Sequence, residues 1–309
     1  MLRAVCVLVT IAIITLVLIP FQWLSVRLRL PTRRSIPVFY HGMVHALLGV
    51  RIREIGKRMH EHPLLIVSNH VSWLDISVIT ALAPVVFVAK REVSTWPMFG
   101  LLARLQRSVF VDRTRRHKTQ EVNSEIAQRL AEGDPVVLFG EGTSSDGNRV
   151  LPFRSALIGA ARDALAEAEH VQRIWIQPLS IAYTRLLGLP LGRQHRPLVA
   201  WYGGSPLWPH LLGIAKRGSI DVVVTWGDPL AFDETSDRKN VARELETTVR
   251  ELTRTAMRGD AGTPRPPPAQ APQPTPAFLF AAKSAKTKDG IGATTQLMWI
   301  AKRLQSTRA

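Results

Sequence analysis

Cysteine is almost absent from this chain of 309 residues, because the only one, Cys6, lies inside the first apolar run. Disulfide bonds, a cysteine-based zinc site and a cysteine nucleophile in the body of the chain are therefore excluded. A reducing compartment that faces the cytosol fits this composition.

Acidic residues are also few, with 24 Asp and Glu against 40 Lys and Arg, which gives a formal net charge of +16. Anionic partners are expected: phosphates of lipid or nucleic acid, or an acidic carrier protein. The basic residues are scattered and no zinc-finger or RNP pattern occurs, which argues against nucleic acid. The sequence also lacks a Gly-x-Ser-x-Gly elbow, so a serine esterase or lipase is not expected.

A long apolar run, by contrast, is present at the N-terminus. Ala4 to Val26 is about long enough to cross a bilayer as a helix, and no small-residue cleavage site follows it, so we expect a retained membrane anchor. Four arginines follow the run within residues 27–34, whereas only Arg3 precedes it. The positive-inside rule then places the rest of the chain in the cytoplasm, at the inner membrane. Pro20 leaves a second arrangement open, a bent pair of helices in one leaflet with Ile36 to Leu48 as the other arm.

Three regions are expected: an anchor region at 1–48, an α/β domain at 49–258, and a Pro-rich linker with a basic tail at 259–309. Short β-branched runs alternate with amphipathic stretches in the middle region, which is typical of an α/β domain with a largely buried sheet. The predicted strands are Leu64–Val67, Val85–Ala89, Ser108–Val111, Val136–Phe139, Ile174–Ile181 and Ile220–Trp226. The predicted helices are Ser72–Leu82, Met98–Leu105, Thr119–Ala131, Phe153–Ala168 and Arg238–Arg258.

His70 and Asp75 are two ionisable residues in an apolar stretch, "SNHVSWLDI". Ser68 and Asn69 are typical N-cap residues and a helical pattern starts at Val71 or Ser72, which places His70 in a strand-to-helix turn. On one continuous helix, residues five apart point in different directions. With His70 in the turn and Asp75 in the first helical turn, the carboxylate can reach the imidazole, fix its tautomer and stabilise its charged form.

A second polar stretch follows a buried strand, "VVLFGEGTSSDGN" at 136–148. Small residues from Gly140 to Gly147 allow backbone amides to approach an anion closely. The stretch lacks the lysine of a nucleotide-binding P-loop.

Asn69-His70 to Asp75 and Phe139-Gly140-Glu141-Gly142-Thr143, in this order, resemble the first and third blocks of the lysophospholipid acyltransferase family, typified by 1-acyl-sn-glycerol-3-phosphate acyltransferase. The second block is similar to "SVFVDR" at 108–113, and the fourth to "IQPLSIAY" at 176–183. The resemblance covers residues 50–230. It implies a mixed central sheet flanked by helices, as in glycerolipid acyltransferases.

The resemblance implies transfer of an acyl group from coenzyme A or acyl carrier protein to a lysolipid hydroxyl, with no metal, cofactor or covalent intermediate. His70 would be the general base and Asp75 its orienting partner. Backbone amides near Gly142, in the Glu141-Gly142-Thr143 loop, would stabilise the oxyanion. By the same resemblance, Glu141 would position the head group of the acceptor.

Lys90 and Arg113 would bind a phosphate of the acceptor, according to the same family pattern. The sequence departs from that pattern at Gly140, where proline is common, and at Ser144, where arginine is common. "EGTSSDGNRVLPFRSAL" and "AWYGG" resemble the branch that includes bacterial lyso-ornithine lipid acyltransferases, whose acceptor carries no phosphate. Lysophosphatidate and lyso-ornithine lipid both remain open as acceptors, and a non-catalytic lipid-binding protein remains the alternative function.

Overall fold

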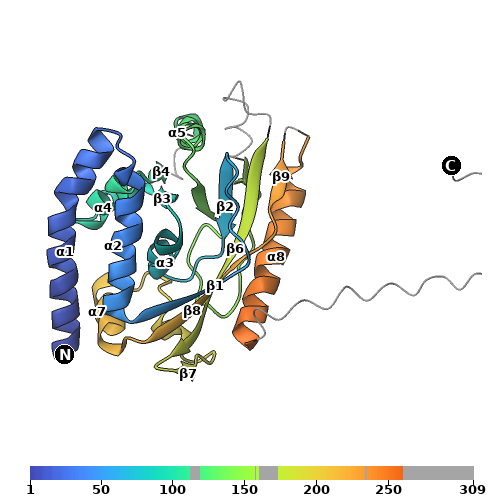
Figure 1. The fold of residues 1–309 in the computed structure, drawn as a ribbon. Coiled ribbons are helices and arrows are strands. Elements are labelled where there is room, and N and C mark those ends of the chain that lie inside the picture. The colour runs from blue at the N-terminus through green and yellow to red at the C-terminus, as the bar shows by residue number, and fades with distance from the viewer. Residues whose placement is uncertain (112–118, 157, 160–172, 234, 260–309) are drawn as a thin grey trace, which may run out of the picture. The chain divides into compact units, whose positions relative to one another are not determined.

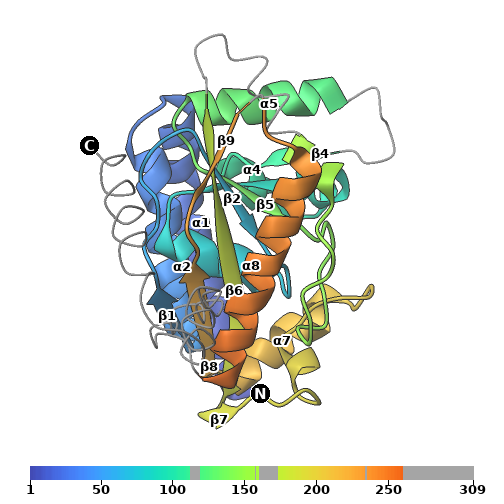
Figure 2. The same ribbon diagram turned by 90° about the vertical axis from the view of Figure 1, so that its right-hand side faces the viewer.

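The computed structural model describes residues 1–111, 119–156, 158–159, 173–233 and 235–259. Within these residues the strands form one nine-stranded sheet (Figures 1 and 2). The strands are β1 (Val50–Ile55), β2 (Leu64–Ser68), β3 (Val86–Lys90), β4 (Val109–Val111), β5 (Val136–Phe139), β6 (Ile174–Leu186), β7 (Leu189–Pro190), β8 (Ile220–Trp226) and β9 (Leu230–Phe232). Their order is β1-β8-β6-β2-β5-β3-β4, with β7 and β9 also paired to β6.

The sheet is mixed, as expected. β6, β2, β5, β3 and β4 run parallel to one another, whereas β8 is antiparallel to β6 and parallel to β1. β2 and β5 are neighbours in register, with Ser68 opposite Phe139. The segments that follow these two strands therefore leave the sheet side by side, at its carboxyl edge.

The helices lie on both faces of the sheet. They are α1 (Leu2–Arg27), α2 (Thr32–Leu48), α3 (Leu74–Leu82), α4 (Phe99–Leu105), α5 (Thr119–Ala131), α7 (Leu207–Arg217) and α8 (Arg238–Arg258), with two short 3₁₀ helices, η1 (Arg91–Thr95) and η3 (Arg196–Leu198). Figure 1 shows α1, α2 and α3 on one side of the sheet and α8 on the other.

Alternating side chains of the central strands fill two separate cores. In β2, Leu64 and Ile66 join the core under α2, α3 and α7, whereas Leu65 and Val67 join the core under α5 and α8. Because both faces are covered, β2 and β5 are buried along their whole length, and all their residues are apolar except Ser68 at the end of β2. This explains why the sequence predicted these strands correctly.

All six predicted strands are present, and four of the five predicted helices are present with small shifts at their ends. The fifth, Phe153–Ala168, lies largely outside the described residues. Sequence analysis missed β1, whose alternation of apolar and charged residues is that of a half-exposed edge strand, and β7 and β9, which are only two and three residues long. It also missed α7, where Pro206 and Pro209 interrupt the helical pattern.

Helix α1 is the one helix among the described residues that is long and apolar enough to cross a membrane. Hydrogen bonds attach it to the rest of the protein along its whole length. Arg3 at its start donates to the carbonyl groups of Ala215 and Leu48. Near its end, Gln22 Nε2 donates to the Leu105 carbonyl at 2.9 Å. Its outward side chains, from Leu2 through Ile13 to Phe21, are exposed, and α1 belongs to the same compact unit as the sheet.

Candidate active site

The turn after β2 brings His70 to the carboxyl edge of the sheet. Asn69 anchors this turn to the neighbouring strand β6, because its side chain donates to the Ile181 carbonyl at 2.9 Å and accepts from the Ile181 N–H at 2.8 Å. The expected N-cap at Ser68 and Asn69 is therefore wrong. Helix α3 begins at Leu74, with Trp73 as its N-cap residue, rather than at Val71 or Ser72.

His70 and Asp75 are in direct contact: His70 Nδ1 lies 2.8 Å from Asp75 Oδ2. The same carboxylate oxygen accepts the backbone N–H groups of Val71 at 2.6 Å and Ser72 at 2.9 Å. Asp75 is fully buried, and these donors compensate its charge. Since Nδ1 faces a carboxylate, it holds the proton, and Nε2 is left as a proton acceptor.

Tyr183, on β6, donates its hydroxyl to the other oxygen of Asp75, Oδ1, at 2.7 Å. Burial, together with the charge of Asp75, raises the pKa of this hydroxyl, so it stays protonated and remains a donor. Sequence analysis assigned no role to Tyr183, although it lies in the fourth family block. The contact joins residues 108 positions apart, so no local spacing could have indicated it.

The loop after β5 folds around His70. Glu141 Oε1 accepts the His70 N–H at 3.0 Å, and Ser145 donates its N–H to the His70 carbonyl at 2.8 Å. The imidazole stacks on Phe139, with ring centroids 4.0 Å apart. His70 is thus held from both ends of its backbone and from one face of its ring.

Glu141 is buried, and its second oxygen, Oε2, has no hydrogen-bond partner among the described residues. Burial raises its pKa to about 8, and the hydrogen bond from the His70 N–H only partly opposes this effect. Glu141 is therefore mainly protonated at neutral pH. It can donate a hydrogen bond to a ligand as well as accept one.

Gly140 explains why this chain departs from the family pattern without losing the turn. Its N–H donates to the Ser68 carbonyl at 2.9 Å, which ties β5 to β2. A Cβ at this position would lie 2.6 Å from the Phe153 ring. A proline would lose the hydrogen bond and collide with Phe153.

Gly142 and Thr143 differ in exposure. Gly142 is buried with a φ of 68°, and its N–H donates to the Phe139 carbonyl at 3.0 Å. Thr143 is exposed, and its N–H has no hydrogen-bond partner among the described residues.

Of the two predicted phosphate ligands, Lys90 lies among the described residues and Arg113 does not. Lys90 is exposed at the end of β3, three residues beyond Phe87, whose partner on β5 is Val137. This places Lys90 at the same edge of the sheet as Gly140. Arg113 lies outside the described residues.

Two charged residues, Asp146 and Arg196, both contact Asn148 in the same loop. Asp146 accepts the N–H and the side-chain amide of Asn148, at 2.9 and 3.0 Å. Arg196, from η3, donates to Asn148 Oδ1 at 3.2 Å, and its buried Nε has no partner among the described residues. The next segment also meets the turn, since the Trp201 N–H donates to the Val71 carbonyl at 2.9 Å. No group of three His, Cys, Asp or Glu side chains is gathered for a metal ion in the described part of the chain.

Comparison with known proteins identifies the family. The family model "Acyltransferase" matches residues 49–182. The lyso-ornithine lipid O-acyltransferase of Brucella abortus is 50% identical over 83% of this chain and 96% of its own length. The lyso-ornithine lipid O-acyltransferase of Rhizobium meliloti is 43% identical over 85% of this chain and 91% of its own length.

A solved structure shows the same fold. The 1-acyl-sn-glycerophosphate acyltransferase from Thermotoga maritima superposes with a TM-score of 0.58 at 20% identity, covering 82% of this chain and 96% of that one. The family model and the identity to these relatives lead to one conclusion: this chain belongs to the acyltransferase family and is an acyltransferase of lipid biosynthesis.

Proposed function

We propose that this enzyme acylates the free hydroxyl of a lysolipid through general-base catalysis by His70. Nε2 removes the proton from the hydroxyl while the hydroxyl oxygen attacks the carbonyl carbon of an acyl thioester. The tetrahedral intermediate then expels the thiolate, which takes the proton from the imidazolium. The observation that carries the proposal is the buried Asp75 carboxylate bound to His70 Nδ1, since it fixes the tautomer and stabilises the imidazolium.

The oxyanion of the intermediate needs a hydrogen-bond donor near the thioester carbonyl. The Gly142 N–H is directed to Phe139, and we therefore assign this role to the exposed Thr143 N–H. Protonated Glu141, which lies beside His70, positions the head group of the acceptor. A thioester is already activated, so this mechanism requires neither a cofactor nor a covalent enzyme intermediate.

The acyl donor is acyl carrier protein or coenzyme A in thioester linkage. Both carriers are strongly anionic, and the net charge of +16 favours their association.

Lyso-ornithine lipid is the acceptor that we favour. Ornithine carries a carboxylate and an ammonium group but no phosphate, and Arg196 and Asp146 offer one partner for each. Ser144 replaces the arginine that a phosphate would use. The relatives in Brucella and Rhizobium, named for this acceptor, support the choice. Lysophosphatidate is the second candidate, with Lys90 and Arg113 as its phosphate ligands.

The apolar helix α1 attaches the protein to the membrane, and its contacts indicate its orientation there. Both of its ends bond to the same compact unit, through Arg3 and Gln22. A helix that crossed the bilayer would have its ends on opposite sides. We therefore place α1 in the plane of the inner membrane, in the cytoplasmic leaflet, with its outward apolar face in lipid and the sheet in the cytoplasm. The division into an anchor region (1–48), a domain (49–258) and a tail (259–309) remains a prediction.

The test offers a radiolabelled acyl thioester to the purified enzyme with lyso-ornithine lipid and lysophosphatidate in parallel. We expect label in lyso-ornithine lipid, and His70→Ala should lower the rate about a thousandfold or more. His60→Ala, which removes an exposed histidine, is the control. A His70→Ala enzyme with normal turnover would rule out the mechanism, and preferential labelling of lysophosphatidate would replace the acceptor.

A further inference from the structure

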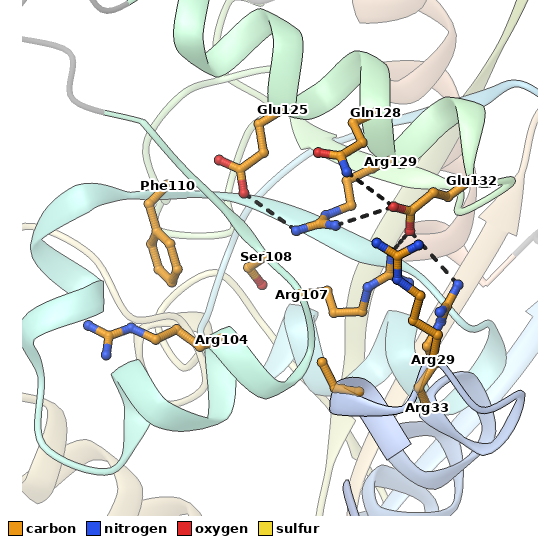
Figure 3. A pocket seen from close by; sticks show the side chains of 11 residues that line it. Arg29, Arg33, Arg104, Arg107, Ser108, Phe110, Glu125, Gln128, Arg129 and Glu132 are labelled. Carbon is orange, nitrogen blue, oxygen red and sulfur yellow. Dashed lines mark hydrogen bonds and ion pairs between the residues drawn. The ribbon is translucent and has the colours of Figure 1, made fainter. Parts of the chain in front are cut away.

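A second polar site lies near the amino ends of the parallel strands, whereas His70 lies at their carboxyl ends. A cavity of about 400 Å³ opens between the α1–α2 turn, α4, the start of β4 and the C-terminal half of α5 (Figure 3). Residues before β4 and after α5 line it, whereas His70 follows the carboxyl end of β2. Because β2 and β4 run in the same direction, the two sites are at opposite ends of the strands.

Arginine dominates this cavity, which we call the arginine pocket. Among the described residues, Arg29, Arg33, Arg104, Arg107 and Arg129 line it, together with two carboxylates, those of Glu125 and Glu132. The lining therefore has an excess of three positive charges. Such an excess in a confined space favours an anion.

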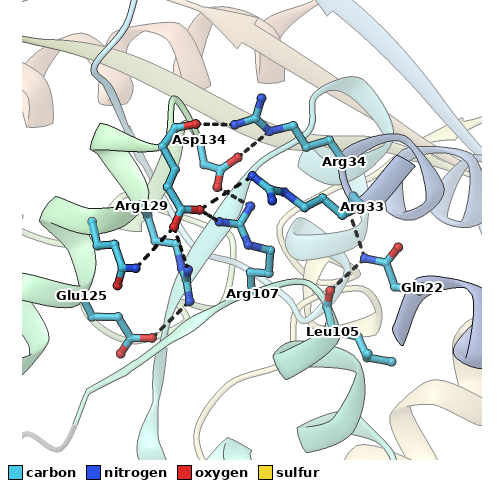
Figure 4. A network of polar contacts seen from close by, with 10 residues as sticks. Gln22, Arg33, Arg34, Leu105, Arg107, Glu125, Arg129 and Asp134 are labelled. Atoms are coloured by element: carbon cyan, nitrogen blue, oxygen red, sulfur yellow. Dashed lines mark hydrogen bonds and ion pairs between the residues drawn. The ribbon is translucent and has the colours of Figure 1, made fainter. Parts of the chain in front are cut away.

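A network of ion pairs holds the arginines together (Figure 4). Glu132 lies 3.8 Å from Arg33 and 4.0 Å from Arg129, and it also contacts Arg107. Arg107 contacts Asp134 as well, which in turn pairs with Arg34 at 2.7 Å. Residues from α2, α5 and the segments before β4 and β5 are thereby fixed around one cavity.

Two of the arginines have no ion-pair partner among the described residues. Arg29 is exposed in the α1–α2 turn, and Arg104 uses one nitrogen for the Ser94 carbonyl at 2.8 Å. Guanidinium groups bind phosphate oxygens through pairs of N–H donors, and the remaining donors of Arg29 and Arg104 are suited to such an anion.

The surroundings indicate where that anion comes from. Exposed apolar side chains lie within one helical turn of lining residues: Trp23 and Leu28, near Val26 at the end of α1, are each 57% exposed, and Leu101, one turn before Arg104 in α4, is 42% exposed. Tryptophan, leucine and arginine together are typical of the boundary between hydrocarbon and lipid head groups. A soluble anion would gain nothing from this apolar rim.

We propose that the arginine pocket binds the phosphate group of an anionic membrane lipid, whose acyl chains lie along the exposed faces of α1 and α4. The bound lipid fixes the orientation of the protein on the membrane surface. Lipid binding at this site requires no acyl transfer, so its test does not depend on the reaction proposed for His70.

The test measures lipid binding by the full-length enzyme in an uncharged detergent. The probes are dioleoylphosphatidylglycerol, dioleoylglycerol with the same chains but no phosphate, and inorganic phosphate. We expect the phospholipid to bind, dioleoylglycerol to bind at least about tenfold more weakly, and high salt to weaken the phospholipid complex. Removing the two unpaired cations with Arg29→Ala/Arg104→Ala should weaken phospholipid binding about tenfold or more.

The matched control is Arg27→Ala/Arg243→Ala, which removes the same charge from exposed positions outside the pocket. It should change phospholipid affinity by less than about twofold, and equal melting temperatures establish that both variants are folded. Equal losses in both variants would overturn the proposal, since only net charge would then matter. Inorganic phosphate that binds as tightly as the phospholipid would also overturn the proposal. So would an Arg29→Ala/Arg104→Ala variant that binds acyl carrier protein more weakly but binds the phospholipid as well as the unmodified enzyme does.

Discussion

Asp75 is the residue on which the geometry of the site depends. Four donors surround its carboxylate: the His70 ring, the N–H groups of Val71 and Ser72, and the Tyr183 hydroxyl. A buried charge is tolerated only when it is compensated in this way. Each donor also restricts the position of the carboxylate and hence the orientation of the imidazole.

Replacing Tyr183 by phenylalanine tests whether the fourth donor positions the carboxylate. Asp75 Oδ1 would be left buried and unpaired, so we expect kcat to fall about tenfold to a hundredfold with little change in KM. Steady-state kinetics with a melting curve separate this effect from unfolding. Tyr202→Phe, at an exposed position, is the control. A kcat equal to that of the unmodified enzyme would contradict a positioning role.

Glu141 should make stability depend on pH. Burial raises its pKa in the folded protein to about 8 from the usual 4.5, so folding favours the protonated form. Its contribution is complete below about pH 4.5 and is lost as the pH rises through about 8. Glu141→Gln removes this titration, so the variant should lose less stability than the unmodified enzyme between pH 5 and pH 8. Thermal melting at both pH values measures it, with Glu61→Gln as the exposed control. Parallel pH dependences would refute the assignment.

At the level of elements, α3 connects the site to the anchor helices. Ser77 of α3 lies between two histidines of α2, at 3.0 Å from His41 Nδ1 and 2.8 Å from His45 Nε2. Burial lowers the pKa of His45 to about 4, and burial with the nearby His45 lowers that of His41 to about 3, so both are neutral at physiological pH. The hydroxyl can then donate to one ring and accept from the other.

Ser77→Ala should therefore destabilise the contact between α2 and α3. Two buried ring nitrogens would lose their partner, which costs about 1–3 kcal/mol. Denaturant unfolding in detergent measures the change, and Ser35→Ala, whose hydroxyl is exposed, is expected to have almost no effect. If Ser77→Ala left the free energy of unfolding unchanged, water would have to replace the hydroxyl at this position.

Elements with a continuous apolar run or a long apolar stripe were predictable, and shorter or interrupted patterns were not. β2, β5 and β8 are buried on both faces, so their apolar runs define them within a residue. α8 has a clear apolar stripe and an Asp237 N-cap. β1 at the sheet edge alternates apolar and charged residues over only six positions, and prolines interrupt the apolar pattern of α7, so neither was recognised. The start of α3 was misplaced because Asn69 bonds to β6 instead of capping the helix.

At the scale of the whole molecule, the orientation of α1 decides how the site meets lipid. The helix has 26 residues and is about 39 Å long, more than the hydrocarbon thickness, yet both ends contact one compact unit. An in-plane helix keeps the sheet, the site and the outward apolar face beside a single leaflet.

Cysteine labelling can test this orientation, because Cys6 is the only native cysteine. In a Cys6→Ser background, Leu2→Cys and Leu28→Cys mark the two ends of α1. An impermeant maleimide should label both positions in inside-out membrane vesicles and neither in right-side-out vesicles. Labelling of the two positions from opposite sides would establish a spanning helix.

The sequence alone determined the local features: the apolar N-terminal run, the buried strands and the two polar turns that follow β2 and β5. These depend on near neighbours, whose periodicity and turn chemistry can be read along the chain. Only the tertiary structure decided which distant groups meet these turns. Tyr183 completes the Asp75 site from β6, and five arginines from five segments line one pocket, because strand pairing and helix packing bring together residues that no spacing relates.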